Sequence, residues 1–248
     1  DYTLDDWMLY VDWLIQEYLP EGVIDTEAEY LAVRAQIAGK VNATLEAYEL
    51  LPNLRSLPEE IFFSYVLAYR VNDEHLDGSR AALLHALLPR VREKNAYDTV
   101  LEVNRWCCEQ ASYMPSDTRT LGPLAMMKST LGRCGEESVF VVSALRSVGI
   151  PARQCYVGRW SHCDDNHAWV EVWIDGVWHY LGGCEPEPAL DRGWFTAAAS
   201  RAMLTYSRIW SCLVNDKKIA YRTPLYTLIN STDSYADCTK LTVNVLDG

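Results

Sequence analysis

Hydrophobic residues recur at helical spacing through most of the first 110 residues. In each segment apolar side chains return every three or four positions, which places them on one face of a helix. Pro20 and Pro52 interrupt the pattern. The pattern predicts helices over residues 3–19, 25–51, 58–69, 79–88 and 97–110. None of these segments carries a catalytic pattern, so we expect residues 1–110 to form a largely helical N-terminal scaffold.

A further predicted helix begins at a cysteine. Cys134 lies between Gly132 and Gly135, and apolar residues then recur at helical spacing until Gly149-Ile150-Pro151 ends the helix. The free N–H groups and the positive dipole end of a helix stabilise a thiolate and lower the pKa of a thiol. We therefore expect Cys134 to be a reactive thiol. The loop over residues 112–128 leads into this helix and is expected to line a cleft.

Strict alternation of apolar and polar residues follows. It predicts a strand from His167 to Ile174, with Asp175-Gly176 as a two-residue hairpin turn and a return strand from Val177. If Ile174 pairs with Val177, His167 lies opposite Cys184 and diagonal to Gly182. A cysteine on a helix start and a histidine on a neighbouring strand are the residue types of thiol catalysis, in which the imidazole acts as the base.

Beyond the hairpin the pattern predicts a helix over residues 197–203 and short strands over 207–214, 218–221, 227–230 and 240–246. The last of these is either an edge strand or the first strand of a further β domain. We accordingly divide the chain into residues 1–110, the helical region, residues 111–205, the core with the cysteine and histidine, and residues 206–248, a β continuation.

Composition narrows the class of protein. The chain has 248 residues, 49% of them hydrophobic, which is ample for a packed core. Its net charge of −12 argues against nucleic acid or an anionic membrane as the main partner. No apolar run is long enough for a transmembrane helix. The chain begins at Asp1 without a methionine, which favours an extracytoplasmic or secreted protein whose signal segment was removed, but leaves the compartment open.

The eight cysteines are too few and too scattered for a disulfide framework. A local disulfide between Cys163 and Cys184 remains an alternative. Zinc binding is an alternative role for His162, Cys163 and His167, but no Cys-x-x-Cys or His-x-x-x-His pair is present to hold a tetrahedral site. We expect no metal and no cofactor.

Three separated motifs resemble the core of the transglutaminase-like superfamily. They are Gly132-Arg133-Cys134-Gly135-Glu136-Glu137-Ser138, the helix end from Leu145 to Arg153, and His167-Ala168-Trp169-Val170-Glu171-Val172. The segment from Trp178 to Trp194 is similar to peptide:N-glycanases of that superfamily. The resemblance implies a papain-like α+β fold, with a helix packed on an antiparallel sheet. It also implies that Cys134 attacks an amide carbonyl and that His167 transfers the proton.

The chain departs from the family at the third catalytic residue. In the family this residue is an aspartate four positions after a tryptophan of the return strand. Here that tryptophan is Trp178, and the position of the aspartate is occupied by Gly182. Two replacements are open: Glu185, if Gly182-Gly183 bends the strand, or an acceptor of the preceding loop, namely Asp164, Asp165 or Asn166. We take Glu185 as the candidate. Trp106 and Trp169 are the candidate substrate-binding residues. Some superfamily members place a residue that binds the oxyanion near the position of Trp106. The backbone N–H of Cys134 is the other candidate donor to the oxyanion.

These observations predict a cysteine-dependent amide hydrolase or acyltransferase of the protease, deamidase, transglutaminase or peptide N-glycanase type, working through a thioester on Cys134. Its expected partners are peptide, protein or glycopeptide substrates, and its oligomeric state is open. The alternative, motivated by Gly182, is a binding or scaffold module that keeps the fold but has lost catalytic competence.

Overall fold

The computed structural model describes residues 27–51, 57–116, 119–211, 214, 216–223, 225–239 and 242. The helix predicted over residues 3–19 lies outside this part, as does all of 240–246 except Thr242. The described helices are α2 (Glu27–Leu50), α3 (Glu59–Phe62), a π-helix (Phe63–Leu67), α4 (Ser79–Val91), α5 (Ala96–Gln110), α6 (Pro123–Ser129), α7 (Cys134–Ser147), α8 (Thr196–Ala199) and a 3₁₀ turn (Thr232–Ser234).

The strands of the described part form one large antiparallel sheet and one short parallel pair. The large sheet has the order β5-β4-β3-β6-β8-β7. Its strands are β3 (Ala152–Val157), β4 (His167–Ile174), β5 (Val177–Leu181), β6 (Tyr206–Ile209), β7 (Ile219–Arg222) and β8 (Thr227–Asn230). The parallel pair joins β1 (Ser112–Tyr113) to β2 (Leu131–Gly132), immediately before α7.

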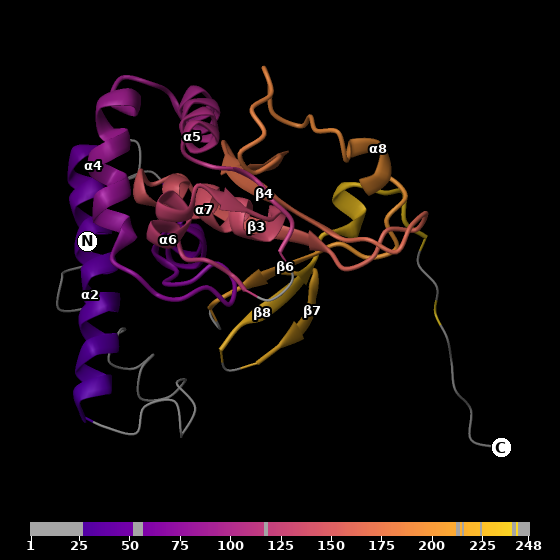
Figure 1. Cartoon of the computed structure of the whole chain (residues 1–248). Coiled ribbons are helices and arrows are strands. Elements are labelled where there is room, and N and C mark those ends of the chain that lie inside the picture. Colours follow the sequence, from indigo (N-terminus) through magenta and orange to yellow (C-terminus); the bar gives the residue numbers. More distant parts are fainter. Residues whose placement is uncertain are drawn as a thin grey trace.

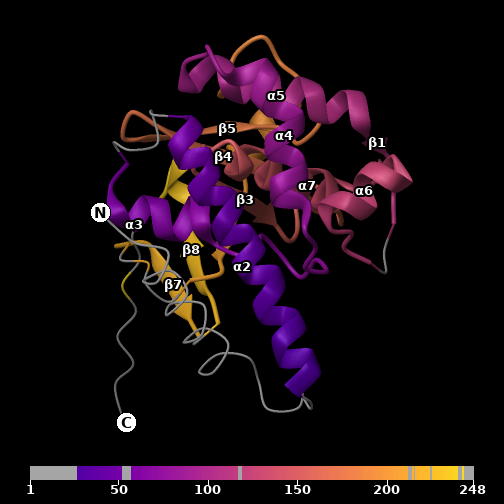
Figure 2. The same cartoon turned by 90° about the vertical axis from the view of Figure 1, so that its left-hand side faces the viewer.

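Helix α7 lies between the other helices and the sheet. It packs on α4 and α5 on one side and on β3 and β4 on the other. The long helices α2 and α4 gather on one side of the molecule, away from β6, β8 and β7 (Figure 1). Turning the molecule shows α2, α4 and α5 in front of the strands (Figure 2). The described part is therefore α+β, with a helix packed on an antiparallel sheet, as predicted.

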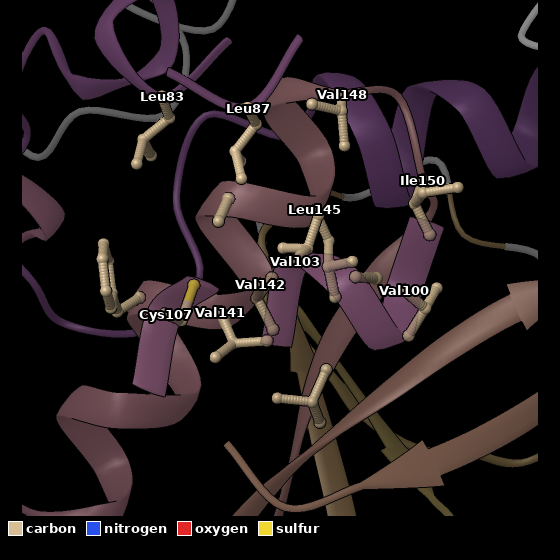
Figure 3. Close-up of a cluster of buried hydrophobic side chains, with 14 of the residues drawn as sticks. Leu83, Leu87, Val100, Val103, Cys107, Val141, Val142, Leu145, Val148 and Ile150 are labelled. Atoms are coloured by element: carbon tan, nitrogen blue, oxygen red, sulfur yellow. The ribbon is translucent and has the colours of Figure 1, made fainter. Parts of the chain in front are cut away.

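The main hydrophobic core forms around α7. Leu87 of α4, Val103 of α5 and Leu145 of α7 are completely buried in it, and the side chains of the three helices converge (Figure 3). At about 25 cal/mol per Å² of buried apolar surface, such side chains contribute about 2 kcal/mol each. The first residue of α7 is thus held by a rigid helix.

The hairpin has the predicted register. Ile174 pairs with Val177, and Trp173 with Trp178. Asp175 has a φ of 49° and Gly176 a φ of 89°, which are the left-handed values that a tight hairpin turn requires. The expected pairing of His167 with Cys184 is wrong, because β5 ends at Leu181 and the chain turns away at Gly182.

Several other boundaries differ from the prediction. The predicted loop over 112–128 contains β1 and most of α6, which begins with Pro123 at its first turn. The predicted helix over 58–69 is divided into α3 and the π-helix. The predicted helix over 197–203 ends at Ala199.

Strands β6, β8 and β7 extend the sheet that β3, β4 and β5 begin, since β3 pairs with β6. Within the described residues, the region expected as a β continuation is therefore part of the same sheet. No helix in this part of the chain combines the length and apolarity needed to cross a membrane.

Candidate active site

Cys134 is the first residue of α7, as predicted. The turn before it is anchored by Glu136, whose completely buried carboxylate accepts hydrogen bonds from the N–H of Arg133 (3.0 Å) and of Leu121 (2.9 Å) and from Nε of Arg119 (3.3 Å). A carboxylate three residues after the N-cap satisfies the free N–H groups of a helix start. The position of Cys134 is thus set by the helix and by the loop tied to its first turn.

His167 is the first residue of β4 and reaches the same place from the sheet. Its backbone pairs with Val157 of β3. The backbone N–H of the next residue, Ala168, lies close enough to the Cys134 thiol to lower its pKa, so the start of the helix and the start of the strand meet. Cys134 and His167 line one cleft of about 840 Å³ together with Tyr156, Asn166, Glu185 and Trp194.

Aromatic rings surround the imidazole. The ring centroid of His167 lies 4.7 Å from that of Trp194 and 5.0 Å from that of Phe195, and Trp160 and Trp169 stack near it at 6.3 and 6.0 Å. Burial in this apolar environment lowers the pKa of His167 to about 4, although the nearby Asp165 acts in the opposite direction. The imidazole is therefore neutral at pH 7.

Burial also raises the pKa of the Cys134 thiol, against the lowering effects of the Ala168 backbone N–H and the charge of Arg133. The expected lowering of this pKa at the helix start is not found, because desolvation of the thiolate has the largest effect. A thiol with a raised pKa beside an imidazole with a lowered one keeps its proton. The resting pair is neutral, which suits an imidazole that accepts the proton only as the sulfur attacks.

Glu185 lies in the cleft, as the candidate orienting acid requires. A Cβ atom added at Gly182 would lie 2.8 Å from Cβ and 2.9 Å from Cδ of Glu185, so Glu185 fills the space that a side chain at position 182 would occupy. Its carboxylate accepts the Nε1–H of Trp194, at 3.0 and 3.1 Å to its two oxygens. Trp194 in turn contacts the ring of His167, and thereby connects Glu185 to the imidazole.

Nε2 of His167 is buried and has no hydrogen-bond partner among the described residues. The loop acceptors considered from the sequence do not supply one. Asp165 and Asn166 line the cleft, with the Asp165 carboxylate accepting the N–H of Asn166 at 2.8 Å. Asp164 is exposed and pairs with Arg159 at 3.2 Å. The arrangement therefore offers one buried imidazole nitrogen and one nearby carboxylate that is bonded to Trp194.

The two tryptophans expected to bind substrate are both buried. Trp106 is 6% exposed and packs on Phe140 of α7 at a centroid distance of 5.9 Å. Trp169 is completely buried, and its Nε1–H donates to Oη of Tyr235 at 2.8 Å. Neither lines the cleft. Their contacts stabilise the helix and the strand that carry the site.

Two residues that face or support the site were not singled out from the sequence. Trp194 is 64% exposed at the cleft, which marks it as a site residue rather than a core one. Glu136 was named from the sequence only as part of the motif around Cys134. Its spacing of three residues from the N-cap is the signal that could have revealed its anchoring role.

The disulfide considered between Cys163 and Cys184 is not formed, since both are free thiols. Cys163 is exposed on the loop before β4, whereas Cys184 is buried in the core around α7. Among the described residues, no group of three or more histidine, cysteine or acidic side chains is arranged to hold a metal ion.

The described part is α+β, and its cleft brings a thiol at a helix start together with an imidazole at a strand start. Residues 86–183 match the family model of the transglutaminase-like superfamily. All three motifs lie within these residues, and the resemblance of this part of the chain to the superfamily core is confirmed.

One curated relative is a peptide-N(4)-(N-acetyl-beta-glucosaminyl)asparagine amidase of Eremothecium gossypii, which is 32% identical over 99 residues. The aligned part is 39% of this chain and 26% of the relative, so the chain matches about a quarter of that protein's length.

Among solved structures, the chain is similar to a protein of Cytophaga hutchinsonii assigned as a cysteine protease (TM-score 0.41, 16% identity, 73% of this chain and 66% of that one). It is also similar to LapG of Legionella pneumophila (TM-score 0.39, 12% identity, 75% of this chain and 87% of that one). The likeness to the superfamily rests on the sequence match over residues 86–183.

Proposed function

We propose that this chain is a cysteine-dependent amide hydrolase in which Cys134 is the nucleophile and His167 the base. The observation that carries the proposal is that Cys134, at the start of α7, and His167, at the start of β4, line the same cleft. A thiol and an imidazole in one cleft are the two groups that thioester chemistry needs.

Because the Cys134 thiol and the His167 imidazole are both neutral at rest, the thiol proton has to be transferred during the attack. As the sulfur attacks the amide carbonyl, the neutral imidazole accepts the thiol proton, and it then gives this proton to the departing amine as the C–N bond breaks. The backbone N–H of Cys134 has no hydrogen-bond partner among the described residues. It lies at the start of α7, where it stabilises the negative charge on the carbonyl oxygen.

Glu185 is the proposed orienting acid. It becomes effective when its carboxylate leaves Trp194 and accepts the Nε2–H of His167, the nitrogen that is otherwise buried without a partner. A carboxylate in that position stabilises the imidazolium that forms during attack. The same contact raises the imidazole pKa toward the range in which proton transfer is efficient.

The surface beside the site supports an extended polypeptide as substrate. Tyr156 and Arg133 line the cleft and also a neighbouring hollow of about 270 Å³, which Tyr206 lines as well. Tyr206 in turn lines a third hollow of about 640 Å³, which exposes Met203. The rings of Tyr156 and Tyr206 are 5.5 Å apart and join the three hollows. An extended chain can lie along such a row.

Hydrolysis is favoured over transfer because the cleft admits water. Polar groups of Asn166, Asp165, Ser116 and Glu185 line it. A thioester surrounded by such groups meets water more readily than a competing amine. The resulting products would be a free carboxylate and the released amine.

The second candidate function is a binding module without activity. The observation that favours it is the unpartnered Nε2 of His167 together with the bond that holds Glu185 on Trp194. A site frozen in this arrangement lacks the third group of a catalytic triad.

Mass spectrometry of reaction products distinguishes these functions. The chain would be incubated with unfolded carboxymethylated casein and with an N-glycosylated peptide, with and without a primary amine. New peptide termini indicate a protease, conversion of asparagine to aspartate indicates glycan release, and incorporated amine indicates transfer. Cys134→Ala is the control. Activity that survives this substitution, or no product from any substrate, would contradict the proposed hydrolase.

A further inference from the structure

The segment that carries Glu185 is held by one buried side chain of a distant helix. Asn104 of α5 is 2% exposed. Its Nδ2 donates to the carbonyl oxygens of Gly182 (3.0 Å) and Glu185 (3.2 Å), and its Oδ1 accepts the N–H of Cys184 at 2.9 Å. Both the nitrogen and the oxygen of the Asn104 amide thus form hydrogen bonds with the backbone of residues 182–185.

The turn at residues 182–185 needs such support because its backbone is strained. Cys184 has a φ of 57°, a left-handed conformation that costs a residue other than glycine about 1–2 kcal/mol. The N–H of Glu185 closes the turn on the Gly182 carbonyl at 3.3 Å. This long hydrogen bond alone contributes about 1 kcal/mol at most, so the turn relies on other contacts.

The turn is also wedged between two helices. A Cβ atom added at Gly183 would lie 2.9 Å from both N and Cα of Ser138, in the first turns of α7. Glycine is therefore required there for close approach to the helix. With α7 on one side and Asn104 of α5 on the other, the backbone from Gly182 to Glu185 has one permitted path, and that path directs Glu185 into the cleft.

We propose that Asn104 is a positioning residue of this enzyme, which acts by fixing the turn from Gly182 to Glu185 and hence the carboxylate of Glu185. The inference rests on the proposed function, since it assigns the orientation of the proposed acid. Asn104 does not line the cleft and acts only through the turn.

The amide of asparagine is specifically suited to this task. Asn104→Asp keeps the acceptor for the Cys184 N–H but removes both donated hydrogen bonds and places a carboxylate against two carbonyl oxygens. Loss of buried partners in this way costs about 1–3 kcal/mol per unsatisfied group. Asn95→Ala is the matched control on the same helix, because Asn95 caps the start of α5 by accepting the N–H of Asp98 at 2.8 Å and does not contact the turn.

The test combines amide hydrolysis with hydrogen exchange. In the wild-type background we expect Asn104→Asp to lower kcat on the order of 10- to 100-fold, as for a displaced catalytic group, with little change in KM. Hydrogen exchange of the peptide that spans residues 182–186 should become faster. Asn95→Ala should change kcat by no more than about twofold and leave that exchange rate unaltered.

A double-mutant cycle separates positioning from simple loss of structure. If Asn104 acts through Glu185, then Asn104→Asp has no further effect on kcat in a Glu185→Gln background. Equal losses of kcat in the two backgrounds, or unchanged kcat and unchanged exchange in Asn104→Asp, would overturn the inference. An inactive wild type would instead refute the proposed function, and hydrogen exchange would still report whether Asn104 holds the turn.

Discussion

The carboxylate of Glu185 occupies the space above Gly182. The resemblance of the motifs implies an aspartate at this position; glycine here leaves room for a side chain from three residues further along the chain. One side chain is thus missing at position 182 and another, from position 185, fills its space and lines the same cleft as His167. This relationship leads to a direct exchange experiment.

Moving the acid back to position 182 should restore activity lost at position 185. Glu185→Gly removes the carboxylate and also the Cβ atom that a side chain at 182 would meet at 2.8 Å. We expect this variant to lose on the order of 10³- to 10⁴-fold in kcat, the range for loss of an orienting acid. Adding Gly182→Asp should recover at least about tenfold, measured as steady-state amide hydrolysis.

The control for this exchange is Gly182→Asp alone. It should lower activity, because two side chains then compete for one space. If Glu185→Gly retains wild-type kcat, or if the double variant regains nothing while remaining folded, then Glu185 does not replace the missing aspartate.

Trp194 should influence the pH below which kcat/KM falls. Burial raises the pKa of Glu185, and the hydrogen bond from Trp194 partly opposes this. Trp194→Phe keeps a ring on His167 but removes the Nε1–H donor, so the carboxyl of the resting enzyme becomes harder to ionise. We expect the acid limb of the pH profile of kcat/KM to move to higher pH. If the acid limb stays in place or moves to lower pH, the hydrogen bond from Trp194 does not determine the ionisation of Glu185.

Glu137 should make stability fall as pH rises. Its carboxyl is buried, with Glu185 and Glu136 nearby, and these effects raise its pKa from 4.5 to about 8. The folded state thus binds a proton more tightly than the unfolded state, so the stabilisation is complete below pH 4.5 and is lost as pH rises toward 8.

Glu137→Gln removes this titration. Relative to wild type, the free energy of unfolding of the variant should rise by at least about 1 kcal/mol between pH 5 and pH 8, since one pKa unit corresponds to about 1.4 kcal/mol. Urea unfolding at the two pH values measures the difference. A difference that stays constant with pH would mean that Glu137 ionises normally.

Glu136 should be the more damaging of the two first-turn acids to remove. Glu136→Ala leaves the half-buried N–H groups of Arg133 and Leu121 without their acceptor, which costs about 2 kcal/mol of unfolding free energy. Thermal unfolding of Glu136→Ala and Glu137→Ala at pH 7 gives the comparison. Equal midpoints would contradict the anchoring role of Glu136.

Local signals predicted the framework of the site. The helical spacing after Cys134 and the stop at Gly149-Ile150-Pro151 gave α7, and the Asp175-Gly176 turn set the register of the hairpin. Both depend on interactions between neighbouring residues, which a single sequence displays directly. The resemblance of the motifs then indicated which residues of this framework meet.

Non-local contacts decided the rest. From the sequence we expected the strand that begins at Val177 to continue past Leu181. Instead the chain turns, because Gly183 packs on α7 and Asn104, 78 positions before Gly182, binds the backbone of the turn. Burial likewise made Trp106 and Trp169 core residues and raised the pKa of Cys134, although a helix start by itself lowers it. Residue type and spacing do not reveal such burial.

The most direct test of the account is the alkylation rate of Cys134 by iodoacetamide near neutral pH, resolved by site with mass spectrometry. His167→Gln keeps the bulk of the side chain but removes the base, and the exposed Cys238 serves as the reference thiol in each protein. The account predicts that labelling of Cys134 slows at least about tenfold in His167→Gln while that of Cys238 is unchanged. Equal labelling of Cys134 in the two proteins would contradict a thiol and an imidazole that work together.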